Sequence, residues 1–238
     1  MIAEKLFDNV YYYKNVIEDP KELVDLIEKT ESDDYKMLLS PWDKWEACSG
    51  EMYLYGSEKT VIHLSDNNIK ERSSGEQYEV TKKIIDQIMG GFKKVCLDYA
   101  EKLGDSEKPM LMQHLQIKKY ESGTYMGAHY DQQEGDQRLR YSLVMYLNDD
   151  YEGGELSFNI KDGVITGTDN AAAEDFLSPL NKDKIMFHIK PEAGSCIIFP
   201  SVSPYSHTAH LVKSGYKYMV PGFWMNKGKY VEGTFYPN

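Results

Sequence analysis

The chain has 238 residues, 41% of them hydrophobic and 13% aromatic, and this composition is typical of a globular protein with one sizeable core. Its formal net charge of −11 disfavours nucleic acid and anionic membrane surfaces as partners, because their phosphates repel an acidic protein. The N-terminus lacks the basic and apolar regions of a signal peptide, and no apolar run is long enough to span a membrane, so we expect a cytoplasmic protein.

Two helices are predicted in the first half of the chain. In the segment EDPKELVDLIEKT, Asp19 is placed to cap the helix, Pro20 to occupy its first turn and Glu22 to complete a capping box. A longer helix is predicted over about residues 77–103, where apolar residues recur at helical spacing until Gly104.

The segment between these helices is polar. It predicts loops with short strands around MYLYG (52–56) and VIHLS (61–65), and the Ser-, Gly- and Asn-containing stretch 66–76 is a candidate lid. We therefore expect residues 1–110 to supply helical support and lid segments.

Strand-like runs follow one another from about residue 111. They are LMQHLQIKKY, RLRYSLVMYLN, GELSFNI, IMFHIK, GSCIIFP and GYKYMVPGFWMN, most of them separated by turn signals such as NDDYEGG. The polar stretch 161–184 interrupts the runs and is predicted to be an insertion in a loop. Helices followed by many strands predict an α+β chain with a β-sandwich or barrel core over residues 111–228. No linker divides the chain, so we expect a single domain over residues 1–238.

A histidine and an aspartate stand two residues apart in the sequence AHYDQQ. In an extended segment, side chains at this spacing point to the same face, so His129 and Asp131 can reach one ion while Tyr130 turns away. Such a pair alone is more often incidental than a metal site. His207 follows an apolar run later in the chain, and two histidines with one carboxylate leave half of an octahedron open. This set suits ferrous iron, whereas zinc more often takes four tetrahedral ligands.

The motifs of the second half occur in a recognisable order. Tyr120, Gly123, the His129-x-Asp131 pair, MYLND, GGELSF, PEAGSCIIFP, His207 and SGYKYMVPGFW follow one another over about residues 112–226. This order resembles the iron(II)/2-oxoglutarate-dependent dioxygenases of the prolyl 4-hydroxylase type. The resemblance implies a double-stranded β-helix, which is a jelly-roll core, with N-terminal supporting helices.

The resemblance also implies residue roles. His129, Asp131 and His207 are the expected iron ligands. His210 competes with His207, but the ten-residue interval between His207 and Lys217 favours His207. Lys217 is expected to pair with the distal carboxylate of 2-oxoglutarate. By residue type alone, Lys217 would be a solvated surface lysine, so its expected role depends on its place after His207.

Further contacts are expected from five other side chains. Tyr120 and Tyr146 are expected to hydrogen-bond the same co-substrate, although strand tyrosines more commonly fill core space. Arg138 or Arg140 is expected to contact the substrate, or both simply form an exposed turn. Tyr125 is expected to wall a groove for proline, and so is Trp224.

The implied activity is hydroxylation of a prolyl residue in a peptide or protein, giving 4-hydroxyproline. The implied cofactors are Fe(II), 2-oxoglutarate and O2, with succinate and CO2 as products and ascorbate as a reductant of the iron. One alternative is a non-catalytic jelly-roll module that binds a carbohydrate or peptide. Another is an oxygenase that acts on a free amino acid, another protein side chain or a nucleobase, of which the acidic charge disfavours the last. A pure binding module has no need for three ligands together with Lys217.

Overall fold

The computed structural model describes residues 1–29, 54–55, 61–64, 76–112, 115–132, 137–159 and 185–226, and these residues form antiparallel sheets with two described helices. The predicted α+β class is therefore confirmed. The predicted insertion at 161–184 lies outside the described residues, and so does the candidate lid apart from Glu76 at the start of the second helix. Neither described helix is both long and apolar enough to cross a membrane.

Both predicted helices are present. Helix α1 (Pro20–Lys29) begins as expected, because the carboxylate of Asp19 accepts a hydrogen bond from the backbone N–H of Glu22 at 2.8 Å. Helix α3 (Glu76–Leu103) ends at Gly104, whose φ of 66° is the left-handed conformation that glycine adopts at helix ends.

The strands form two main sheets and a short ribbon. The larger sheet has the order β1 (Ile2–Phe7), β2 (Val10–Lys14), β11 (Ser195–Pro200), β7 (Leu139–Tyr146), β14 (Lys217–Met225), β5 (Leu115–Tyr120) and β4 (Val61–Leu64). The smaller sheet has the order β10 (Ile185–Ile189), β9 (Leu156–Asn159), β12 (His207–Ala209), β6 (Tyr125–His129) and β3 (Leu54–Tyr55). The ribbon pairs β13 (Val212–Ser214) with β8 (Glu152–Gly153).

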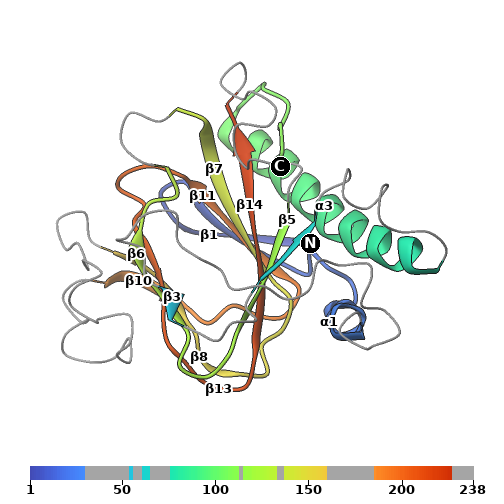
Figure 1. Ribbon diagram of the computed structural model, residues 1–238. Helices are drawn as coiled ribbons and strands as arrows, with labels where there is room; N and C mark the ends of the chain where they lie inside the picture. The colour runs from blue at the N-terminus through green and yellow to red at the C-terminus, as the bar shows by residue number, and fades with distance from the viewer. Residues whose placement is uncertain are drawn as a thin grey trace.

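The central strands of the larger sheet are buried on both faces. One face packs against the helices, and Figure 1 shows α3 running along this face with α1 beside it. The other face packs against the smaller sheet, and this second cluster is the interior of the jelly roll. Alternate residues of one strand therefore enter different cores: Met145 of β7 lies in the helix-facing core, and Tyr146 lies in the jelly-roll interior.

The first residues of the chain differ from the prediction. Residues 1–110 were expected to supply helices and lid segments, but β1 and β2 extend the larger sheet, with Tyr13 of β2 paired to Cys196 of β11. Tyr13 packs against the helices and Tyr12 against the smaller sheet, so both faces of β2 are buried. A strand buried on both faces lacks the apolar–polar alternation that makes a strand recognisable in sequence.

Candidate active site

Three side chains that could hold a metal ion meet near the ends of two neighbouring strands. His129 is the last residue of β6, His207 is the first residue of β12, and the two are register partners. Asp131 follows β6 by two residues. One ligand atom from each of the three residues can be chosen so that all lie within 4.8 Å of one another. Oδ1 of Asp131 lies 3.5 Å from Nε2 of His129, and Oδ2 lies 3.7 Å from Nε2 of His207.

Backbone carbonyls fix the orientation of both imidazole rings. Nδ1 of His129 lies 2.8 Å from the carbonyl oxygen of Gly127, and Nδ1 of His207 lies 3.2 Å from that of Tyr205. A carbonyl oxygen can only accept a hydrogen bond, so in the neutral rings Nδ1 carries the proton and Nε2 carries the free lone pair. Both Nε2 atoms are the ones nearest to Asp131, and a carbonyl partner on the other nitrogen is typical of metal-binding histidines.

The electrostatics of the cluster favour neutral His207 and ionised Asp131. Burial, and next the neighbouring His129, lower the pKa of His207 to about 4, although Asp131 opposes this shift. Burial alone would raise the pKa of Asp131, but His207, His129 and a hydrogen bond from Ser142 together hold it well below its usual range. At neutral pH His207 and Asp131 therefore have the protonation states that a divalent metal requires of its ligands.

The segment after β6 is anchored to neighbouring strands of the larger sheet. The backbone N–H of Gln132 donates to the carbonyl of Ser201 at 3.0 Å, and the side chain of Gln132 accepts a hydrogen bond from the N–H of Leu139. The hydroxyl groups of Ser142 and Ser201 are 2.8 Å apart. These bonds hold Asp131 close to the two histidines.

A buried lysine lies in the same jelly-roll interior. Lys217 is 1% exposed, and its ammonium group donates to the carbonyl of Gly154 at 2.7 Å. The rings of Tyr120 and Tyr146 surround it, with centroids 5.4 and 5.3 Å from Nζ. Burial lowers the pKa of Lys217 to about 7, and Glu155 opposes this shift. The structure thus brings together the three residues that were expected to bind 2-oxoglutarate.

Two of the expected substrate contacts lie elsewhere. Trp224 is 1% exposed in the helix-facing core, on the opposite face of the larger sheet from the jelly-roll interior, and its ring packs against Tyr141. Arg140 forms ion pairs with Asp105 and Glu107 and lies over the ring of Trp224. Contacts with the core and with the segment after α3 therefore account for both side chains, and this placement corrects the expectation that Trp224 walls a substrate groove.

The other two expected substrate residues lie at or just before the start of a strand. Arg138 is half-buried just before β7, and its carbonyl accepts a hydrogen bond from the N–H of Asn226 at 2.8 Å. Tyr125 is 9% exposed at the start of β6, opposite Tyr55 of β3. Neither residue belongs to the metal-binding cluster of the described residues.

The competing histidine lies outside the cluster. Nε2 of His210 lies 2.7 Å from the hydroxyl of Ser157. The neighbours of Ser157 on β9, Leu156 and Phe158, are in the jelly-roll interior, so Ser157 and its partner His210 are on the other face of the smaller sheet.

One charged residue near the cluster was missed. Lys118 is 6% exposed and shares a strand face with Tyr120, inside the jelly roll, whereas its neighbour Lys119 binds Glu28 of α1 outside it. Burial lowers the pKa of Lys118 to about 8, while the nearby carboxylate of Asp131 raises it. Two adjacent lysines resemble a solvated pair in sequence, and only their position on a strand buried on both faces distinguishes them.

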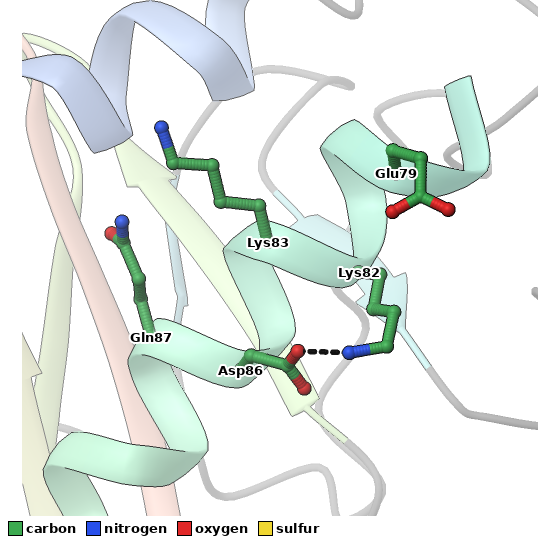
Figure 2. A pocket seen from close by; sticks show the side chains of 5 residues that line it. All are labelled: Glu79, Lys82, Lys83, Asp86 and Gln87. Carbon is green, nitrogen blue, oxygen red and sulfur yellow. Dashed lines mark hydrogen bonds and ion pairs between the residues drawn. The ribbon is translucent and has the colours of Figure 1, made fainter. Parts of the chain in front are cut away.

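A pocket on the surface of α3 is separate from this site. Figure 2 shows that it is lined by charged side chains of the helix, among them Lys82, which pairs with Asp86. Lys83 pairs with Glu22 of α1 at 2.6 Å. This pocket lies on the helix that covers the outer face of the larger sheet, whereas the His129, Asp131 and His207 cluster lies at the smaller sheet.

Comparison with known proteins agrees with this geometry. Residues 115–225 match the model of the 2OG-Fe(II) oxygenase superfamily. No curated protein sequence matches the chain. Among solved structures, a prolyl-4-hydroxylase from Pseudomonas putida has a TM-score of 0.54 at 15% identity. The alignment covers 92% of this chain and 94% of the chain of that enzyme.

Two further solved structures share the fold. A prolyl hydroxylase from Trichoplax adhaerens, in complex with a hypoxia inducible factor peptide fragment, has a TM-score of 0.55 at 12% identity, with 93% of this chain and 86% of its own covered. A viral collagen prolyl hydroxylase from Paramecium Bursaria Chlorella virus-1 has a TM-score of 0.51 at 16% identity, with 92% and 96% covered.

These matches confirm the predicted double-stranded β-helix with supporting helices and the predicted resemblance to prolyl 4-hydroxylase-type enzymes. The segment that matches the 2OG-Fe(II) oxygenase superfamily model contains His129, Asp131, His207 and Lys217.

Proposed function

We propose that this protein is an iron(II)- and 2-oxoglutarate-dependent oxygenase that hydroxylates a prolyl residue in a peptide or protein. The observation that carries the proposal is the cluster of His129, Asp131 and His207, in which both Nε2 atoms and a carboxylate face one another within 4.8 Å. Two neutral imidazoles and one carboxylate are the donor set of oxygenases that keep coordination positions open for co-substrate and oxygen.

The residues of the site fit the metal. His129, Asp131 and His207 are largely buried, with side-chain exposures of 8%, 16% and 6%. The hydrogen bonds at Nδ1 hold both rings in the tautomer that presents Nε2 to an ion. When bound, iron(II) would supply, with 2-oxoglutarate and O2, the oxidising chemistry that hydroxylates an unactivated carbon and yields succinate and CO2.

The residues also fit an anionic co-substrate. Lys217 places a positive charge in the jelly-roll interior, where a dianion in an acidic protein needs a local counter-charge. The hydroxyl of Tyr146 beside it is buried and has no hydrogen-bond partner among the described residues. Lys217 would hold the distal carboxylate of 2-oxoglutarate, and Tyr120 and Tyr146 would orient the molecule.

The rest of the protein excludes water and supports the site. Phe199 packs its ring 4.7 Å from that of His207. The helices cover the other face of the larger sheet, so we propose that residues 1–238 act as one domain, with 111–228 as the catalytic core. A prolyl substrate is proposed because the three solved structures compared above are prolyl hydroxylases. Ascorbate is proposed as a reductant that restores oxidised iron.

The first test is calorimetric titration of 2-oxoglutarate, without oxygen, into the metal-free and the Mn²⁺-loaded protein, with Lys217→Ala alongside. Metal-dependent binding that is lost in the variant is the expected result. Binding in neither form would overturn the assignment and favour a non-catalytic binding module.

The second test addresses the substrate. The iron-loaded protein is incubated with 2-oxoglutarate, O2 and a panel of peptides with and without proline, and products are identified by mass spectrometry. The expected result is the gain of one oxygen atom on proline. Gain on another residue type, or on free amino acids only, would assign a different substrate to the same chemistry.

A further inference from the structure

The hydroxyl groups of buried tyrosines in this protein fall into two groups. Four of them form hydrogen bonds of 2.8 Å. Tyr12 Oη accepts from the backbone N–H of Glu192, and Tyr13 Oη donates to Asp98. Tyr99 Oη donates to the carbonyl of Asn9, and Tyr218 Oη donates to Glu28. The hydroxyls of Tyr146 and Tyr151 are buried without a hydrogen-bond partner among the described residues. A buried hydroxyl without a partner is costly, so such groups are rare and need an explanation.

Both exceptions lie around the same ammonium group. Nζ of Lys217 is 5.3 Å from the ring centroid of Tyr146 and 5.9 Å from that of Tyr151. Burial raises the pKa of the Tyr146 hydroxyl, and the neighbouring Tyr151 adds to this shift. Lys217 itself donates to one protein acceptor, the carbonyl of Gly154. Two buried tyrosines whose hydroxyls lack a partner among the described residues therefore have their rings beside one ammonium group, and an ammonium group has capacity for further hydrogen bonds.

The turn that carries Tyr151 is built to bring it close to Lys217. Gly154 has a φ of 68°, and a Cβ atom there would lie 2.8 Å from Cε2 of Tyr151 and 3.2 Å from Cδ of Lys217. The absence of a side chain at Gly154 therefore allows the ring and the lysine chain to approach from two sides.

A second lysine holds this turn in place. The ammonium group of Lys190 donates to the carbonyl of Tyr151 at 2.6 Å and to that of Gly153 at 3.0 Å. It also lies 4.0 Å from the centroid of the Tyr151 ring, within the range of a cation–π contact. Lys190 follows β10 of the smaller sheet, so it ties the turn to a strand that does not carry Lys217.

We infer that Tyr151 is a further binding residue for the distal carboxylate of 2-oxoglutarate, together with Lys217 and Tyr146, and that Lys190 is a positioning residue for Tyr151. A carboxylate accepts several hydrogen bonds, so it would satisfy both tyrosine hydroxyls and the remaining ammonium donors. The inference rests on the proposed function, because it assigns a residue to the co-substrate of that activity.

The test uses the Mn²⁺-loaded full chain without oxygen and compares two ligands by calorimetry. One is 2-oxoglutarate, and the other is 2-oxovalerate, which has the same chain with a methyl group in place of the distal carboxylate. Tyr151→Phe is expected to weaken 2-oxoglutarate binding by roughly 10-fold and to leave 2-oxovalerate binding unchanged. Equal affinity of the variant and the wild type for 2-oxoglutarate would overturn the inference, as would an equal loss for both ligands.

A matched control separates binding from folding. Tyr99→Phe also removes one buried hydroxyl, but it breaks the bond to the carbonyl of Asn9, so it should lower the melting temperature and leave 2-oxoglutarate affinity unchanged. Tyr151→Phe removes an unsatisfied hydroxyl, so the melting temperature of the ligand-free variant should be unchanged or higher. A lower melting temperature for ligand-free Tyr151→Phe would indicate a structural hydroxyl and contradict the inference.

Lys190 is tested by its conservative and non-conservative variants. Lys190→Met should weaken 2-oxoglutarate binding several-fold, and Lys190→Arg should restore most of it, since both lysine and arginine can bridge the two carbonyls. No loss in Lys190→Met would remove its positioning role. If the wild-type protein does not bind 2-oxoglutarate at all, the proposed function fails and this inference fails with it, a result distinct from selective loss in Tyr151→Phe.

Discussion

His129 and His207 are register partners on β6 and β12, with ring centroids 4.2 Å apart and each Nδ1 directed at a backbone carbonyl. The pairing of two strands therefore sets the spacing of the two nitrogen donors. Asp131, on the segment after β6, completes the set. This site and the side chains around it lead to predictions about the metal, the co-substrate and the fold.

The first prediction concerns the proposed metal ligands. Asp131→Ala and His207→Ala should each lower Mn²⁺ affinity, because each removes a donor atom. Loss of a residue that only hydrogen-bonds a ligand costs roughly 10–100-fold, and the loss here should be larger. Calorimetric titration of Mn²⁺ measures this effect. His188→Ala, which removes an exposed histidine of β10, is the matched control and should bind Mn²⁺ like the wild type. Wild-type affinity in either ligand variant would contradict the metal assignment.

The second prediction is a pH dependence that arises from Lys217. Its pKa of about 7 in the ligand-free protein should rise when a dianion binds, because the anion favours the charged ammonium. Binding above about pH 7 therefore takes up a proton, and 2-oxoglutarate affinity should fall with rising pH by at most about tenfold per unit. Titration in buffers of different ionisation heat measures the proton uptake, and binding without proton uptake above about pH 7 would contradict this prediction.

The same residue predicts the opposite trend for stability. In the unfolded chain the ammonium group of Lys217 has its ordinary pKa of 10.5, whereas in the folded protein its pKa is about 7. Between these values the unfolded state binds more protons, so the contribution of Lys217 to the free energy of unfolding rises with pH. Denaturant titrations of the wild type and Lys217→Met across this range compare the two slopes. Equal slopes would contradict the lowered pKa.

The third prediction concerns Lys118, the buried cation beside Asp131. Its ammonium group repels a divalent ion, so Lys118→Met should tighten Mn²⁺ binding, on the order of fivefold. Lys118→Arg keeps the charge and is the control. Weaker Mn²⁺ binding in Lys118→Met would instead mean that the lysine orients the carboxylate of Asp131.

The fourth prediction distinguishes structure from substrate binding at Arg140. Because its guanidinium group pairs with two carboxylates and lies over two rings, Arg140→Ala should lower the free energy of unfolding by about 1–2 kcal/mol. Affinities for Mn²⁺ and 2-oxoglutarate should not change. Unchanged stability together with loss of peptide hydroxylation would indicate that Arg140 contacts the substrate and is not a structural residue.

The elements that sequence predicted are those with local signals. The start of α1 depends on Asp19 and the end of α3 on Gly104, and both effects act within one helical turn. The His129-x-Asp131 spacing similarly lies within one extended segment. His207 and Lys217 required the order of several motifs, because spacing along the chain does not show which distant strands meet.

The features that sequence missed depend on whether a strand face packs against the helices or faces the jelly-roll interior. Lys118 and Lys119 are adjacent, yet one enters the jelly roll and the other binds Glu28. Trp224 was expected near the substrate, but its place on β14 turns it toward the helices. In a sheet covered on both faces, both sets of side chains are buried, so composition cannot assign them to the site or to the core.

The position of β14 in the larger sheet has a consequence for biosynthesis. This strand, residues 217–225, lies between β7 and β5, so the sheet remains in two parts until the ribosome has made nearly all of the described chain. The strand also carries Lys217, so the proposed co-substrate site is completed only at that stage. Sheets that depend on pairings between distant segments form slowly, and the edges of β7 and β5 stay unpaired until β14 has been synthesised. Chaperone dependence during synthesis is the expected cost of placing the last described strand at the centre of the sheet.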